Sequence, residues 1–77
     1  MTEIEKVAQE CINEHLNLSN NNVFPPTSAF YTMGFDSLEM MEIIMSMENR
    51  LLITISNDDA ARIRTFKDLC ETFERYV

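Results

Sequence analysis

Five consecutive residues near the middle of the chain combine a turn glycine, a helix-capping residue and a hydroxyl group. They are Gly34, Phe35, Asp36, Ser37 and Leu38. Gly34 allows a sharp turn, including a positive φ angle, and Asp36 is a preferred residue type at helix N-caps. Ser37 would then lie in the first helical turn, where unpaired backbone amides and the helix dipole favour a phosphate. The pattern suits a serine that carries a phosphodiester, although Ser is also common in first turns that have no such role.

The helix that begins at Asp36 is expected to continue to about Leu51 and to be apolar on two sides. Its core face, read at 100° per residue, consists of Met40, Ile43, Ile44, Met47 and Leu51. A second apolar strip, nearly opposite, consists of Leu38, Met41 and Met45, with Glu39, Glu42 and Glu48 along its borders. A buried central helix would also be apolar on both sides, but the carboxylates favour a docking surface for a partner with an apolar pocket and a basic rim.

Helical spacing also dominates the rest of the chain. A first helix is expected from about Glu3 to His15 or Leu16, opened by a Thr2–Glu5 capping box. Its apolar stripe consists of Ile4, Val7, Ala8, Cys11, Ile12 and Leu16. A long loop rich in Asn and Pro follows over residues 17–35, and the residues expected to anchor it to the core are Val23, Phe24, Phe30 and Met33.

Two further helices are expected after Leu51. A short one covers Asn57 to Ile63, with Ser56 or Asn57 as its cap and two acids in its first turn. The last helix is capped by Thr65 with Asp68 three places on, and its apolar stripe consists of Phe66, Leu69, Cys70, Phe73 and Val77. The predicted fold is all-α, a small four-helix bundle with three main helices, a short third helix and a long loop between helices 1 and 2.

Composition restricts the class of function. With 77 residues, one domain covering residues 1–77 is expected, too small for a deep substrate pocket. Thirteen acidic against six basic residues give a formal charge of −7, which disfavours nucleic-acid binding and suits basic protein partners. No apolar run approaches the roughly 20 residues of a membrane span, and no signal peptide is visible. We expect a cytoplasmic monomer that binds or carries and is not an enzyme.

The cysteines and the histidine do not form a reactive or metal-binding cluster in the sequence. Cys11 and Cys70 are far apart and fall on apolar helix faces, so buried free thiols are expected in preference to a disulfide or metal site. His15 lies near the edge of the first apolar stripe, with no second His beside it. We interpret it as a boundary residue, and no metal site is predicted.

The segment around Ser37 resembles the acyl carrier protein family, in which G-x-D-S-L at the start of a helix is the attachment signature. Here the motif stands in G-F-D-S-L-E-M-M-E-I-I-M-S-M-E-N-R-L, and the resemblance extends over nearly the whole chain to a last helix that begins T-F-K-D-L. It implies that Ser37 accepts 4′-phosphopantetheine from coenzyme A, transferred by a Mg²⁺-dependent carrier-protein synthase, a phosphopantetheinyl transferase. The thiol of this arm would carry the acyl group, and Asp36 would help the synthase engage the site.

The resemblance also implies partners and a docking helix. Acyl-transfer, chain-elongation or ligase enzymes with basic docking surfaces would bind the second helix, and the apolar interior would shelter the acyl chain. The matching docking positions are Leu38, Glu39, Met41, Glu42, Met45 and Glu48. Relatives often have acids where this chain has Thr32, Asn49 and Arg50, and a Pro where it has Ser56. A dedicated carrier in polyketide, lipid or other specialised synthesis is therefore as consistent with the sequence as the general carrier of fatty-acid synthesis.

Other functions remain open at this point. A peptidyl or aminoacyl carrier shares the fold and the arm, but Asp36 before the serine and the acidic second helix favour acyl carriage. A G-D-S-L serine hydrolase is disfavoured because Phe35 interrupts the motif and the one candidate base, His15, precedes the serine. Residues 56–63 lack the alternating ligands of an EF-hand calcium loop. An unmodified helical interaction module is the remaining alternative.

Overall fold

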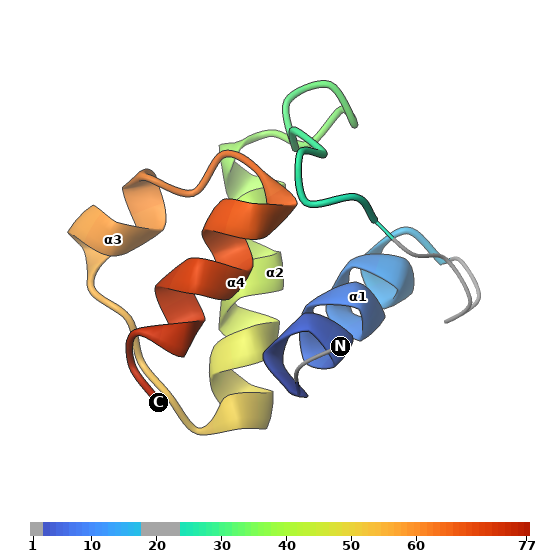
Figure 1. Ribbon diagram of the computed structural model, residues 1–77. Coiled ribbons are helices and arrows are strands. Elements are labelled where there is room, and N and C mark those ends of the chain that lie inside the picture. The colour runs from blue at the N-terminus through green and yellow to red at the C-terminus, as the bar shows by residue number, and fades with distance from the viewer. Residues whose placement is uncertain (1–2, 18–23) are drawn as a thin grey trace.

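The backbone of the described residues forms four helices. The computed structural model describes residues 3–17 and 24–77. The helices are α1 (Glu3–His15), α2 (Ser37–Leu51), α3 (Asn57–Ala61) and α4 (Phe66–Glu74). α1 packs against both α2 and α4, whereas α3 lies at the side of the molecule away from α1 (Figure 1). Within the described ranges there is no strand, only an isolated bridge between Ala29 and Thr65. The predicted all-α fold with a short third helix is confirmed.

The core is built from the apolar faces that the helical spacing predicted. α1 buries Ile4, Val7, Ala8, Cys11 and Ile12, α2 buries Ile43, Ile44 and Met47, and α4 buries Phe66, Leu69, Cys70 and Phe73. Three predicted members, Leu16, Met40 and Leu51, are half-buried and pack against this core. α3 has no buried residue, and it is fixed by the buried side chains of Ile55 before it and Ile63 after it.

Two details of the prediction are wrong, both at helix C-termini. α3 ends at Ala61, and Ile63 lies beyond it as a buried anchor of the following turn. α4 ends at Glu74, so Val77 leaves the apolar stripe and is 84% exposed. The predicted cap at Thr2 and the loop anchor Val23 lie outside the described residues. Phe24 and Met33 are half-buried against the core and Phe30 is buried, as expected.

The end of the long loop is fastened to the start of α4 by backbone hydrogen bonds. The N–H groups of the first helical turn have no intrahelical acceptors, and here the loop supplies them. Phe66 N–H donates to the carbonyl of Ser28 at 2.9 Å and Lys67 N–H donates to that of Pro26 at 3.0 Å. In return, Phe30 N–H donates to the carbonyl of Arg64 at 2.9 Å. These bonds hold the loop in place directly before the turn that leads into α2.

The predicted capping residues of the later helices are in place. Thr65 and Asp68 form a reciprocal capping box on α4, and the Ser56 hydroxyl accepts from the N–H of Asp59 at 3.1 Å at the start of α3.

No helix within the described residues is long and apolar enough to cross a bilayer.

Candidate functional site

The turn before α2 has a Schellman pattern with Gly34 at its left-handed position. Gly34 N–H donates to the carbonyl of Tyr31 at 3.1 Å, and Phe35 N–H donates to that of Phe30 at 3.1 Å. These are the two bonds of the motif, and the Phe30 and Phe35 rings, 5.9 Å apart, form its apolar contact. Gly34 has φ +88, and a Cβ there would meet no atom within 4 Å. The backbone angle, not a lack of space, is therefore what favours glycine.

Asp36 and Glu39 form a reciprocal capping box at the start of α2. The Asp36 side chain accepts from the N–H of Glu39 at 2.8 Å, and the N–H of Asp36 donates to the Glu39 carboxylate at 3.3 Å. Ser37 is the first helical residue and is exposed. Among the described residues, the N–H groups of Ser37 and Leu38 have no protein acceptor. The serine hydroxyl thus lies beside two free amides at the positive end of a helix dipole, which is a suitable place for a phosphate.

His15, the last residue of α1, contacts residues around the start of α2. Its Nε2 lies 3.1 Å from the Glu39 carboxylate, and its ring meets the Phe35 ring edge-on with centroids 5.6 Å apart. His15 therefore touches residues on both sides of the Asp36–Ser37 pair. The helical spacing predicts that His15 lies at the edge of the apolar stripe, but it does not predict this contact, because no local spacing links α1 to the start of α2.

The second apolar strip of α2 is in solvent, as its position on the helix suggested. Leu38, Met41 and Met45 are 65%, 59% and 56% exposed. The three neighbouring glutamates, Glu39, Glu42 and Glu48, differ in their contacts. Glu42 is exposed, whereas Glu39 serves the capping box and His15. Glu48 accepts from the N–H of Ile55 at 3.0 Å and so holds the connection from α2 to α3.

Arg50, at a position where relatives often have an acid, joins two helices in this structure. Its guanidinium binds the carboxylate of Glu14 and lies 3.6 Å from that of Glu10, both on α1. The ion pairs join the C-terminal end of α2 to α1. The residue types were visible in the sequence, but the pairing depends on how the two helices cross. Thr32, another departure, donates from its hydroxyl to the carbonyl of Ala29 at 2.8 Å within the turn.

The two cysteines of the chain and the possible metal ligands among the described residues do not form a second reactive site. Cys11 and Cys70 are buried and free. Burial raises the pKa of the Cys70 thiol to about 12, and burial likewise raises the pKa of Cys11. A thiol is nucleophilic only as its thiolate, so neither cysteine is a suitable acyl acceptor. No group of three or more His, Cys, Asp or Glu within the described ranges is placed to hold a metal ion.

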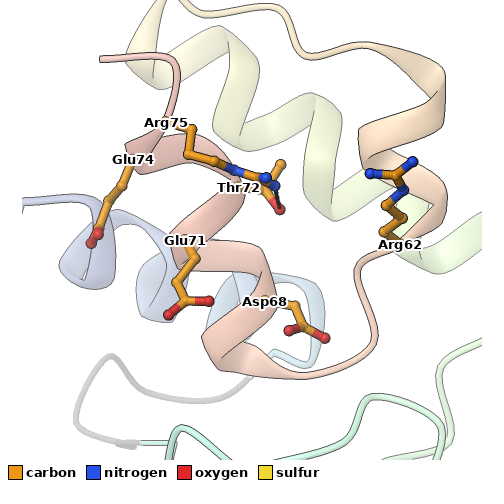
Figure 2. Close-up of a pocket in the computed structure, with 6 residues that line it drawn as sticks. All are labelled: Arg62, Asp68, Glu71, Thr72, Glu74 and Arg75. Carbon is orange, nitrogen blue, oxygen red and sulfur yellow. Dashed lines mark hydrogen bonds between the residues drawn. The ribbon is translucent and has the colours of Figure 1, made fainter.

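Two surface hollows lie away from Ser37. One, of about 430 Å³, is lined by charged and polar side chains, and in Figure 2 the Arg75 side chain extends towards Thr72. Arg75 donates to the Thr72 hydroxyl at 3.3 Å. Carboxylates and guanidinium groups share this hollow, so its charges largely balance. The other hollow, of about 620 Å³, lies between α1, α4 and the loop, with Phe24, Pro25, Pro26 and Phe66 among its walls.

Comparison with known proteins identifies the family of the chain. A family model for the phosphopantetheine attachment site matches residues 6–73. The chain is 35% identical over 65 residues to an acyl carrier protein of Nitratidesulfovibrio vulgaris, covering 84% of this chain and 86% of the relative. It is 35% identical over 69 residues to an acyl carrier protein of Exiguobacterium sibiricum, covering 90% and 87%. The chain therefore belongs to the acyl carrier protein family. Members of this class are carriers and not enzymes, and their cofactor is phosphopantetheine.

Proposed function

We propose that the chain, acting as one domain over residues 1–77, carries acyl groups as thioesters on a 4′-phosphopantetheine arm attached to Ser37. The observation that carries this assignment is the position of Ser37. It is the exposed first residue of α2, next to the two N–H groups without protein acceptors. The family match supplies the identity of the arm, and the helix start supplies a local reason for its phosphate to be at this residue.

Each residue of the motif has a distinct part in this proposal. The arm supplies the thiol that forms the thioester. Ser37 Oγ is the attachment atom, and the N–H groups of Ser37 and Leu38 are donors for phosphate oxygens. Asp36 uses one carboxylate oxygen to cap the helix, which leaves its exposed side free to engage a carrier-protein synthase. Gly34 sets the direction in which the chain enters α2 through its positive φ.

The exposed strip of α2 is proposed as the docking surface for the enzymes of the pathway. These are a phosphopantetheinyl transferase and acyl-transfer, chain-elongation or ligase enzymes with basic docking surfaces, in fatty-acid, polyketide or related biosynthesis. Leu38, Met41 and Met45 supply exposed apolar contact area, and methionine adapts to several partner shapes. Glu42 supplies an exposed carboxylate that would steer a basic partner. Glu39 and Glu48 also belong to the proposed surface, with part of their bonding capacity used inside the chain.

The attachment site is tested by incubating the purified chain with coenzyme A, Mg²⁺ and a phosphopantetheinyl transferase and measuring its intact mass. We expect one added phosphopantetheine on the wild-type chain and none on Ser37→Ala. Ser46→Ala is the matched control, because Ser46 is an exposed serine on the same helix but away from its N-terminus. Circular dichroism should show that both variants are folded. Modification that persists in folded Ser37→Ala would refute the assignment.

A further inference from the structure

The carboxylate of Glu39 is held at both of its oxygen atoms. Oε1 accepts from the N–H of Asp36 at 3.3 Å, as one half of the capping box. Oε2 lies 3.1 Å from Nε2 of His15, which belongs to a different helix. Because an ionised carboxylate can only accept a hydrogen bond, Nε2 of His15 is the donor. The cap of α2 is therefore completed by a side chain of α1.

The ring of His15 is itself held by aromatic packing. Its side chain is 20% exposed, and it meets the buried Phe35 ring edge-on with centroids 5.6 Å apart. Phe35 in turn packs against the buried ring of Phe30, 5.9 Å away. A hydrogen bond to a carboxylate is stronger than one between neutral groups, and partial burial weakens it less than full exposure would. His15 can therefore hold Glu39 in one orientation.

The orientation of Glu39 matters because its carboxylate shares a helix end with two open amides. These are the N–H groups of Ser37 and Leu38, which have no acceptor within the described residues. Carboxylates bind such amides well and are favoured at the positive end of a helix. A Glu39 carboxylate released from α1 would compete with an incoming phosphate for these donors, and its negative charge would repel the phosphate.

We propose that His15 is a positioning residue for loading of the arm: by holding the Glu39 carboxylate towards α1, it keeps the two amides beside Ser37 open to the phosphate. This inference rests on the proposed function of Ser37. It assigns a role in loading to a residue of α1, outside both the attachment motif and the proposed docking surface.

Arg50 provides a matched control because it joins the same two helices at the other end of α2. Its guanidinium pairs with the carboxylates of Glu10 and Glu14 on α1. Arg50→Gln should loosen α1 from α2 without releasing Glu39. We expect its kcat for loading to equal that of the wild type, at a temperature at which circular dichroism shows every variant to be folded.

The test measures arm loading by a phosphopantetheinyl transferase with coenzyme A over a range of carrier concentrations. His15→Asn, whose shorter amide does not reach Glu39, should lower kcat about three- to tenfold, the equivalent of about one hydrogen bond. KM for the carrier should change little, because the exposed strip of α2 is untouched. His15→Phe keeps an aromatic ring without the donor and should behave like His15→Asn. His15→Gln, whose amide nitrogen is as many bonds from Cα as Nε2 of histidine, should recover most of the rate.

A double-variant cycle tests whether His15 acts through Glu39. Glu39→Ala removes the carboxylate that would move onto the amides, so adding His15→Asn to it should lower kcat no further. A second readout is the ¹H–¹⁵N NMR spectrum of the chain before loading. An amide proton that gains a carboxylate acceptor moves to lower field. We expect this shift at Ser37 and Leu38 in His15→Asn and not in His15→Gln.

The possible outcomes separate this inference from the proposed function. Loading of folded His15→Asn and His15→Phe at the wild-type kcat would overturn the inference alone, because Ser37 would still accept the arm. A wild-type chain that takes up no arm would overturn both. An equal loss of kcat in Arg50→Gln would assign the effect to loosened helix packing and overturn the positioning role. A higher KM at unchanged kcat would assign His15 to docking and overturn it as well.

Discussion

The two faces of α2 have similar side chains in opposite environments. On one face Ile43, Ile44 and Met47 are almost completely buried against α1 and the rest of the core. On the other, Leu38, Met41 and Met45 are more than half exposed. Methionine occurs on both faces, so residue type alone does not decide burial. What differs is the surroundings, because the core face meets apolar stripes of other helices whereas the exposed face is bordered by the carboxylate of Glu42.

This difference separates residues that hold the fold together from residues that are available to partners. An apolar side chain that is mostly exposed in the folded chain gains little from burial there, so removing it should destabilise the fold only slightly. The same side chain can contribute to binding when a partner covers it. Stability and binding measurements on matched variants of α2 should therefore give opposite rankings.

The largest expected effect comes from the core face. Met47→Ala leaves a cavity at a fully buried site and should lower the free energy of unfolding by about 2–5 kcal/mol. Met41→Ala makes the same chemical change on the exposed face and should cost less than about 0.5 kcal/mol. Urea unfolding of both variants measures the two values. Equal destabilisation would show that the exposed strip is part of the core and would remove the basis of the docking surface.

The next largest loss of stability is expected at Gly34, in the turn that leads into α2. Gly34→Ala should cost about 1–2 kcal/mol, because an L residue is strained at positive φ while a Cβ at this position meets no atom within 4 Å. Gly34→Asn should cost less, since Asn tolerates the left-handed region. Thermal unfolding of the pair provides the measurement. If Asn is as costly as Ala, the loss does not arise from the backbone angle.

A smaller loss of stability is expected at Arg50, which joins the C-terminal end of α2 to α1. Arg50→Glu replaces the ion pairs with Glu10 and Glu14 by a cluster of three carboxylates. These groups are partly exposed, so the loss should be about 1 kcal/mol and should shrink as salt screens the charges. The reversed pair, Glu14→Arg with Arg50→Glu, should recover part of it. A loss that does not depend on ionic strength would contradict an electrostatic origin.

The smallest effect lies outside α2 and should leave both faces unchanged. The Tyr76 hydroxyl donates to Asp59 and accepts from the N–H of Ser56 at 3.0 Å, which ties α3 to the end of the chain. This hydrogen bond holds the pKa of Asp59 below its ordinary value. The contact therefore stabilises the fold above the ordinary aspartate pKa, and this contribution is lost as the pH falls through the lowered value.

Tyr76→Phe should return the pKa of Asp59 towards its ordinary value, measured by NMR titration of the Asp59 carboxyl. Val77→Ser is the control at the neighbouring position. An Asp59 pKa that stays low in Tyr76→Phe would show that Ser56 and the nearby arginines, not Tyr76, are the main cause.

The sequence predicted those parts of the structure that depend on local spacing. The bounds of α1 and α2, the capping boxes of α2 and α4, and the exposure of Leu38, Met41 and Met45 all follow from helical periodicity and capping chemistry. The helix ends at Ala61 and Glu74 were missed because an apolar residue at helical spacing, Ile63 and Val77 respectively, follows each of them. The contacts of His15 with Glu39 and of Arg50 with Glu14 depend on how α1 crosses α2, which no local pattern specifies. The positive φ angle of Leu52, the C-cap of α2, was missed because leucine is an unexpected residue there.

The central claim is that the arm is attached at Ser37, with its phosphate beside the open amides of the first turn of α2. The most direct measurement is the ¹H–¹⁵N NMR spectrum of the chain before and after loading by a phosphopantetheinyl transferase. We predict that the largest amide shift changes occur at Ser37 and Leu38, with small changes at Ser28, Ser46 and Ser56. Full loading by mass with the largest changes centred on another serine would contradict the claim.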